Sequence, residues 1–201
     1  MNKRYYSQWQ KKYQELQAYQ VEHGHVNVPR SDGSLGNWVN NQRKAYKKAK
    51  LDSDRIKLLE WLGFVWNPYE QQWQGQYLAL QTYKAKRGHC NVSQGDKENK
   101  VLGNWVGKQR ASYKKGRIEQ DKINLLEELG FVWDIDDKKW REKYQLLRVY
   151  QVQNGHCDVP QMDGSLGMWV SNQRQRNTNF LLRQDRIKML KQAGFRFRIS
   201  W

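Results

Sequence analysis

The stretch LGNWVNNQR at residues 35–43 returns almost unchanged as LGNWVGKQR at residues 102–110 and as LGMWVSNQR at residues 166–174. The Trp residues of successive copies are 67 and then 64 residues apart. Self-similarity at a nearly fixed spacing is typical of tandem repeats, in which each copy is one structural unit. The chain is therefore predicted to hold three copies of one unit.

The segments on either side of this stretch recur as well. Each copy opens on the pattern W-x3-Y-x2-L-x2-Y, continues through G-H-x-N-V or G-H-x-D-V, and closes on G-F-x-W or G-F-x-F. The opening Trp residues are Trp9, Trp73 and Trp140. The predicted domains, called repeats 1, 2 and 3 below, are residues 5–67, 68–134 and 135–201.

The apolar residues of each copy recur at the spacing of helices. In copy one they are Trp9, Tyr13, Leu16 and Tyr19 for a first helix, and Leu35, Trp38, Val39, Gln42 and Tyr46 for a second. Both sets follow the 3.6-residue period that places side chains on one helix face. A third helix is predicted from about Ser53 to Leu62, and strand signals are too short to build a sheet. The predicted fold class is all-α, with three tandem three-helix bundles of about 65 residues each.

Glycine and serine residues indicate where these helices begin and end. Gly24, Gly88 and Gly155 follow the first helix of each copy, at the position where a left-handed backbone most often ends a helix. Ser34 and Ser165 precede the second helix and are predicted to act as its N-caps.

The recurring aromatic residues are interpreted as core packing. A unit of about 65 residues has a small core, and large aromatic rings bury enough surface to compensate. Stacking on nucleic-acid bases is the alternative for these rings.

The composition describes a basic, globular chain. Its 201 residues include 36 Lys and Arg against 20 Asp and Glu, a net charge of +16, which points to a polyanionic partner. Aromatic residues make up 13% of the chain, and disordered chains are poor in them. No run of about 18 apolar residues could cross a membrane, and the first ten residues lack the apolar core of a secretory signal. We expect a soluble cytoplasmic protein, associated with the nucleoid if it is bacterial.

The positive charge is concentrated at the end of the second helix and in the turn that follows. The candidate phosphate-binding residues are Arg43, Lys44, Lys47, Lys48 and Lys50 in copy one, Lys108, Arg110, Lys114, Lys115 and Arg117 in copy two, and Arg174, Arg176 and Arg183 in copy three. On a helical wheel Lys44, Lys47 and Lys48 face away from the apolar stripe. Cations are also favoured near a helix C-terminus by the helix dipole, so an ordinary solvated face is the alternative.

A Gln-Arg pair ends the repeated stretch in all three copies. Gln42 lies within the apolar stripe and must find polar partners there, which we expect in the loop backbone around G-H-x-N-V. Arg43 lies at the edge of the stripe, where it could bind a phosphate. The alternative is an ion pair within the unit to Asp54, and to Asp121 or Asp185 in the other copies.

Metal binding and catalysis find little support. His25, His89 and His156 recur, and Cys90 and Cys157 follow two of them, but a zinc site needs about four converging ligands. These histidines are predicted to fix the loop by hydrogen bonds or against a ring. No nucleophile–base pair and no pair of carboxylates recurs across the copies, so we expect neither an enzyme nor a bound cofactor.

Together, W-x3-Y-x2-L-x2-Y, G-H-x-N-V-P, L-G-x-W-V-x2-Q-R and L-G-F-x-W resemble the helicase-associated domain over residues 5–197. Ser93 replaces the proline of the other copies, and Phe197 replaces the final Trp. The resemblance implies small all-helical repeats that occur beside superfamily-2 helicase cores in bacteria and contact nucleic acid. The chain contains no G-x-x-x-x-G-K-[ST] motif of an ATP site.

The expected function is therefore that of a non-catalytic, monomeric accessory region of a helicase-type protein. It would bind nucleic acid, DNA rather than RNA, and could also contact a helicase core. One alternative is a protein-docking module, indicated by Tyr69, Ile135 and Trp61 near the ends of the units. Another is a reader that places the third helix, with Arg55 and Lys57, in the major groove.

Overall fold

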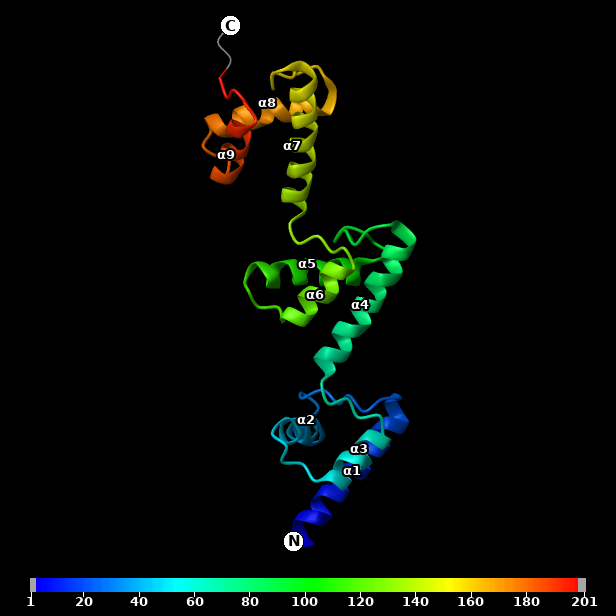
Figure 1. Cartoon of the computed structure of the whole chain (residues 1–201). Coiled ribbons are helices and arrows are strands. Elements are labelled where there is room, and N and C mark those ends of the chain that lie inside the picture. Colours follow the sequence, from blue (N-terminus) through cyan, green and yellow to red (C-terminus); the bar gives the residue numbers. More distant parts are fainter. Residues whose placement is uncertain (1–2, 199–201) are drawn as a thin grey trace. The chain divides into compact units, whose positions relative to one another are not determined.

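The structure, a computed structural model, describes residues 3–198, which form nine helices and no strand. The helices are α1 (Lys3–His23), α2 (Gly33–Lys47), α3 (Ser53–Trp61), α4 (Pro68–Arg87), α5 (Lys100–Lys114), α6 (Gln120–Glu128), α7 (Ile135–Asn154), α8 (Gly164–Thr178) and α9 (Gln184–Gln192) (Figure 1). The all-α prediction with three helices per repeat is confirmed. The chain divides into two compact units, one up to Gly88 and one from His89. None of these helices combines the length and apolar character that crossing a bilayer requires.

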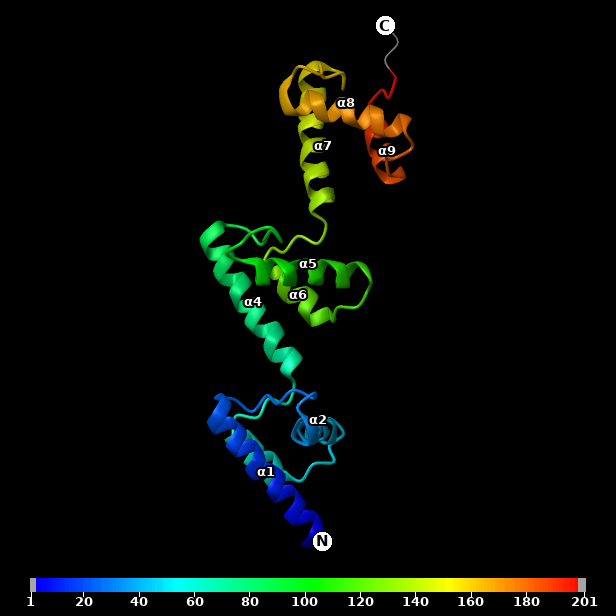
Figure 2. The same ribbon diagram turned by 180° about the vertical axis from the view of Figure 1, so that it is seen from behind.

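Repeat 1 packs its three helices around one apolar core, with α1 and α2 crossing each other and α3 lying along α1 (Figures 1 and 2). Each helix contributes one fully buried aliphatic side chain, namely Leu16, Val39 and Leu59. The Tyr13 hydroxyl on α1 donates a hydrogen bond of 3.0 Å to the Leu58 carbonyl oxygen. This bond fixes α3 against α1 at the edge of the core.

The same core positions recur in the other repeats. In repeat 3 the fully buried residues are Leu147, Val170 and Leu190, and in α4, α5 and α6 they are Leu80, Val106 and Leu126. The opening Trp of each copy stacks on the Tyr four residues later, with ring centroids 5.2 to 5.4 Å apart. The recurring aromatic residues at the start of each copy therefore belong to the core.

Glycine ends the first helix of each repeat, but serine does not cap the second. Gly88 and Gly155 have left-handed backbones at the C-caps of α4 and α7, and Gly24 follows α1 with a φ of 74°. The prediction for Ser34 and Ser165 is wrong, because α2 and α8 begin one residue earlier, at glycine. Each serine hydroxyl instead accepts a hydrogen bond from a lysine of the preceding long helix.

Candidate nucleic-acid interface

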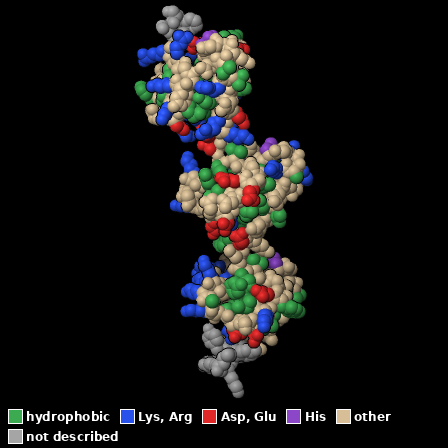
Figure 3. Space-filling model, in the orientation of Figure 1, with side chains coloured by type: hydrophobic (Ala, Val, Ile, Leu, Met, Phe, Trp, Pro, Cys, Tyr) green, Lys and Arg blue, Asp and Glu red, His purple; other side chains and the backbone are tan. Residues whose placement is uncertain are grey.

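The second helix of each repeat, with the turn after it, carries cations and no carboxylate. Residues 33–51, 100–118 and 164–183 contain no Asp or Glu. The exposed basic side chains there are Lys44, Lys47, Lys48, Lys50, Lys100, Lys108, Lys114, Lys115, Arg117, Arg176 and Arg183. In the body formed by repeat 1, Lys and Arg side chains gather along one edge in the space-filling view (Figure 3). These segments are the part of each repeat best suited to a polyanion.

The turn after the second helix has the same backbone in all three repeats. It contains one residue with positive φ, which is Ala49 at 51°, Gly116 at 62° or Phe180 at 57°. The residue after it closes the turn by donating its N–H to a carbonyl oxygen five residues earlier, at 2.8 to 2.9 Å. Side chains on either side of the turn are therefore presented in the same way in each repeat.

Phe180 occupies this left-handed position with its side chain 96% exposed. A left-handed backbone costs a non-glycine residue about 1–2 kcal/mol, and nothing that Phe180 packs against offsets that cost. Phe180→Gly is expected to raise the free energy of unfolding of the full chain by about 1 kcal/mol, measured by urea denaturation. Gly116→Ala, the reverse change in repeat 2, should lower it by a similar amount. A less stable Phe180→Gly chain would contradict this account of the turn.

The arginine of the Gln-Arg pair is used inside each repeat. Arg43 Nε donates to the Val65 carbonyl oxygen at 2.9 Å, Arg43 Nη2 donates to Asn27 Oδ1 at 3.1 Å, and the guanidinium lies 5.1 Å from the centre of the Phe64 ring. Burial lowers the pKa of Arg43 below its usual value. These contacts pin the G-H-x-N-V loop and the end of the repeat to α2.

Arg110 and Arg174 make the same kind of contacts. Arg110 bonds the Val132 carbonyl oxygen and Asn91, and Arg174 bonds the Arg196 carbonyl oxygen and Asp158. Burial is the largest influence on the pKa of both arginines and lowers it. Five of the thirteen candidate phosphate-binding residues have their guanidinium groups engaged within the repeat, because Arg176 donates to the Leu181 carbonyl oxygen and Arg183 to Asp185 as well.

The ion pair across the turn, which was the alternative to phosphate binding for these arginines, is not the one formed. Asp54 instead lies 3.8 Å from Lys57 Nζ, and Asp185 bonds Arg183 at 2.7 Å. In repeat 3 the arginine of the Gln-Arg pair, Arg174, forms its ion pair with Asp158 of the G-H-x-D-V loop. Because Arg183 also lies 3.8 Å from Asp137, repeat 3 offers fewer unpaired cations than repeats 1 and 2.

Gln42 is buried as predicted, but its partners are different. Gln42 Oε1 accepts a hydrogen bond of 3.0 Å from Trp9 Nε1, and Gln42 Nε2 donates to the Trp38 carbonyl oxygen at 3.5 Å. In repeat 3, Gln173 bonds Trp140 in the same way at 2.9 Å. The glutamine thus satisfies the indole N–H of the core Trp, and the loop backbone expected as its partner is not the group it bonds.

The recurring histidines hold the loop, as predicted. Nδ1 of His25, His89 and His156 accepts a hydrogen bond from the backbone N–H two residues later, at 3.2 to 3.3 Å. His25 and His156 also lie 5.8 Å from a tyrosine ring of the first helix. Across residues 3–198 no three His, Cys, Asp or Glu side chains come together in a way that could hold a metal ion.

Three small helical repeats, each presenting a basic and acid-free second helix, define a tandem helical-repeat protein. The chain belongs to the helicase-associated domain family, whose model matches residues 7–67, 70–134 and 137–198. These matches are to the accessory domain and include no catalytic helicase domain. No curated protein and no solved structure matches the chain.

Proposed function

We propose that the chain is a non-catalytic nucleic-acid-binding array, an accessory region of a helicase-type protein that contacts the DNA backbone. The observation that carries this proposal is the acid-free second helix and turn of each repeat, with exposed cations at its end. Lysines that neutralise phosphates release condensed counterions, and this release makes binding favourable and salt-dependent.

Fewer residues are proposed to contact phosphates than the thirteen basic candidates of the sequence. Arg43, Arg110 and Arg174 each bond a carbonyl oxygen within their own repeat. Phosphate contact is therefore proposed for the exposed Lys and Arg side chains of the second helix and its turn. Within residues 3–198, no ion pair engages Lys44, Lys47, Lys48 or Lys50. Repeats 1 and 2 are therefore proposed to supply most of the backbone contacts.

The test is the salt dependence of binding when three lysines of repeat 1 are neutralised. In the full chain, Lys44→Gln, Lys47→Gln and Lys48→Gln together should reduce the magnitude of the log–log slope on duplex DNA by about 2.7, at about 0.9 per phosphate contact. The slope is measured by fluorescence anisotropy of a labelled duplex over a salt series.

The control carries the same change of net charge elsewhere. Lys86, Lys188 and Lys191 are exposed and lie outside the second helices and turns; changing all three to Gln should leave the slope nearly unchanged. If both triple variants lower the slope equally, only net charge matters, and the proposed contact surface is wrong.

Two exposed aromatic side chains favour a second candidate function, docking onto a helicase core or another effector. Trp61 is 79% exposed and Tyr69 is 85% exposed, whereas Ile135 is half-buried. Large exposed rings of this kind are enriched at protein interfaces. Under this function, Trp61→Ser and Tyr69→Ser would weaken the complex with a helicase core, measured by calorimetry, and would leave the affinity for DNA unchanged.

A further inference from the structure

A hollow between the three helices recurs in repeats 1 and 3. In repeat 1 it has a volume of about 710 Å³, and in repeat 3 about 680 Å³. The matching residues that line both are Trp9 and Trp140, Trp38 and Trp169, Gln42 and Gln173, Lys12 and Lys143, and Arg55 and Arg186. The same side chains thus build the same hollow in two separate copies.

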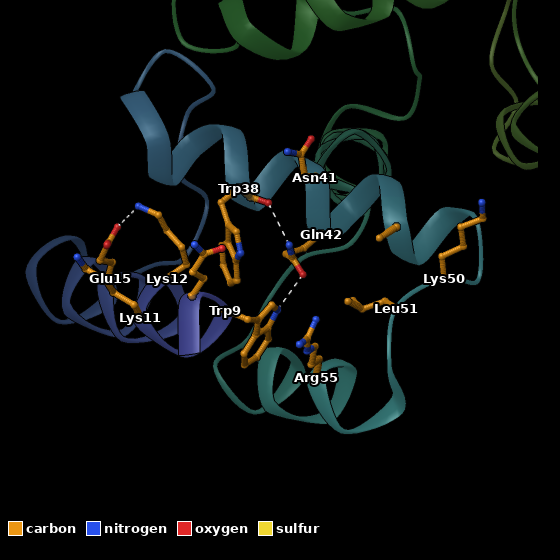
Figure 4. A pocket seen from close by; sticks show the side chains of 12 residues that line it. Trp9, Lys11, Lys12, Glu15, Trp38, Asn41, Gln42, Lys50, Leu51 and Arg55 are labelled. Carbon is orange, nitrogen blue, oxygen red and sulfur yellow. Dashed lines mark hydrogen bonds and ion pairs between the residues drawn. The ribbon is translucent and has the colours of Figure 1, made fainter. Parts of the chain in front are cut away.

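Trp9, Trp38 and Gln42 are in contact at the floor of the hollow. In repeat 1 the Trp9 indole N–H is bonded to Gln42, and the Trp9 and Trp38 ring centroids lie 5.8 Å apart at 59°. Figure 4 shows Trp38 and Gln42 projecting from α2 toward Trp9 on α1, with Arg55 of α3 next to Trp9. Trp9 is buried, whereas Trp38 is only half-buried, so Trp38 has ring surface available to a ligand.

Arg55 of α3 supplies a cation at the hollow. Its guanidinium carbon lies 5.1 Å from the centre of the Trp9 ring, and no hydrogen bond or ion pair joins it to another described residue. Lys11, Lys12 and Lys50 also line the hollow. Among its described lining residues the one carboxylate is Glu15, which is paired with Lys12. This excess of positive charge favours an anionic occupant, and an arginine fork suits a phosphate.

The corresponding arginine of repeat 3 is already paired with a carboxylate, which it shares with Arg141 and Arg183. Arg186 lies 4.9 Å from the centre of the Trp140 ring and donates to Asp137 Oδ1 at 3.2 Å. Hydrogen bonds from Arg141, first, and from Arg186 lower the pKa of Asp137, so this carboxylate is ionised at neutral pH. Repeat 1 has Tyr6 at the matching position of the sequence and therefore lacks this carboxylate.

We infer that the hollow of repeat 1 binds one nucleotide of an unpaired strand, with its phosphate on Arg55 and its base against Trp38. This inference rests on the proposed function and adds to it a second, recessed contact for single strands. An unpaired base has a free face for an aromatic ring, whereas a base in a duplex is already stacked and must be flipped out at a cost of a few kcal/mol. Repeat 3 does not bind in this way while Asp137 holds Arg186.

The experiment measures the affinity of the full chain for two labelled probes, a thymidine oligonucleotide and a blunt hairpin duplex. Arg55→Gln should weaken binding of the oligonucleotide about tenfold, the loss expected for one charge-assisted contact, and binding of the duplex by less than about twofold. Arg186→Gln is the matched control in repeat 3 and should change neither affinity by more than about twofold. Circular dichroism of each variant verifies that it is folded.

A gain-of-function variant makes the test independent of damage to repeat 1. Asp137→Asn releases Arg186 and should strengthen oligonucleotide binding by about threefold or more. Equal effects of Arg55→Gln and Arg186→Gln, or equal losses on both probes, would overturn the inference and leave the salt-dependent duplex binding intact. Competition by polyglutamate as strong as by the oligonucleotide would show an acidic-peptide site instead. If the unmodified chain binds neither probe, the proposed function itself fails.

Discussion

Gly36→Ala is expected to destabilise repeat 1 by about 3 kcal/mol or more, the scale of severe overpacking. A Cβ atom at Gly36 would lie 2.0 Å from the Pro29 carbonyl oxygen and 3.0 Å from its carbonyl carbon. Both atoms belong to the backbone, so no rotation of a side chain relieves the clash. The loop would have to move away from α2, and it would take the buried Val26 and Val28 out of the core.

The predicted loss of stability in Gly36→Ala is opposite in sign to the gain that helix propensity alone would give, so the two explanations can be distinguished. Inside a helix, Ala is more favourable than Gly by about 1 kcal/mol. Gly75 in α4 is the matched control, because nothing lies within 4 Å of a Cβ atom placed there. Urea denaturation of the full chain should show Gly75→Ala slightly more stable and Gly36→Ala much less stable than the unmodified chain. Equal stability of the two variants would mean that the loop and α2 are not in close contact.

The same close approach explains why glycine recurs in the repeated stretch. At Gly103 the Cβ would lie 2.3 Å from the Ser93 carbonyl oxygen, and at Gly167 it would lie 1.9 Å from the Pro160 carbonyl oxygen. Copy two keeps the glycine although serine has replaced the proline. The requirement therefore comes from the path of the loop backbone and not from the proline ring.

The helices could be predicted from the sequence because their signals are local. Apolar spacing and glycine-ended helices depend on residues within a few positions of each other, and these predictions are confirmed for all three copies. The Ser34 cap failed because α2 already begins at Gly33, and the Ser34 hydroxyl accepts a hydrogen bond from Lys12, 22 residues away. A helical wheel places Gln42 inward, but it could not identify Trp9, 33 residues away, as its partner.

In the candidate site, too, features set by a single helix could be predicted, whereas features set by packing between helices could not. The wheel correctly turned Lys44, Lys47 and Lys48 toward solvent, since exposure follows from the angle on one helix. The pairing of arginines depends on how helices pack. The sequence therefore did not distinguish Arg55, which has no hydrogen-bond or ion-pair partner among the described residues, from Arg186, which bonds Asp137. Comparison of the repeats could have found this difference. Arg55 and Arg186 occupy equivalent positions in repeats 1 and 3, but the position of Asp137 in repeat 3 is occupied by Tyr6 in repeat 1.

Arg43→Ala is expected to have the second large effect. It distinguishes a role of Arg43 in the fold from a role of Arg43 in nucleic-acid binding. The change leaves the Val65 carbonyl oxygen and the Asn27 side chain without their donor and removes the cation from the Phe64 ring. The expected loss is about 2–3 kcal/mol of the free energy of unfolding, measured by urea denaturation. The slope of duplex affinity against salt, measured where the variant is folded, should not change.

Arg43→Lys tests whether charge alone accounts for the effect. A lysine keeps the positive charge, but its single ammonium group cannot reproduce the planar fork that bonds two acceptors while lying over a ring. Arg43→Lys should therefore lose most of the stability that Arg43→Ala loses. If Arg43 instead binds a phosphate, Arg43→Ala will reduce the magnitude of the salt slope by about 0.9 and leave stability unchanged. A role in the fold predicts a change in the free energy of unfolding and none in the salt slope. A role in phosphate binding predicts the reverse, so the two measurements together decide the role of Arg43.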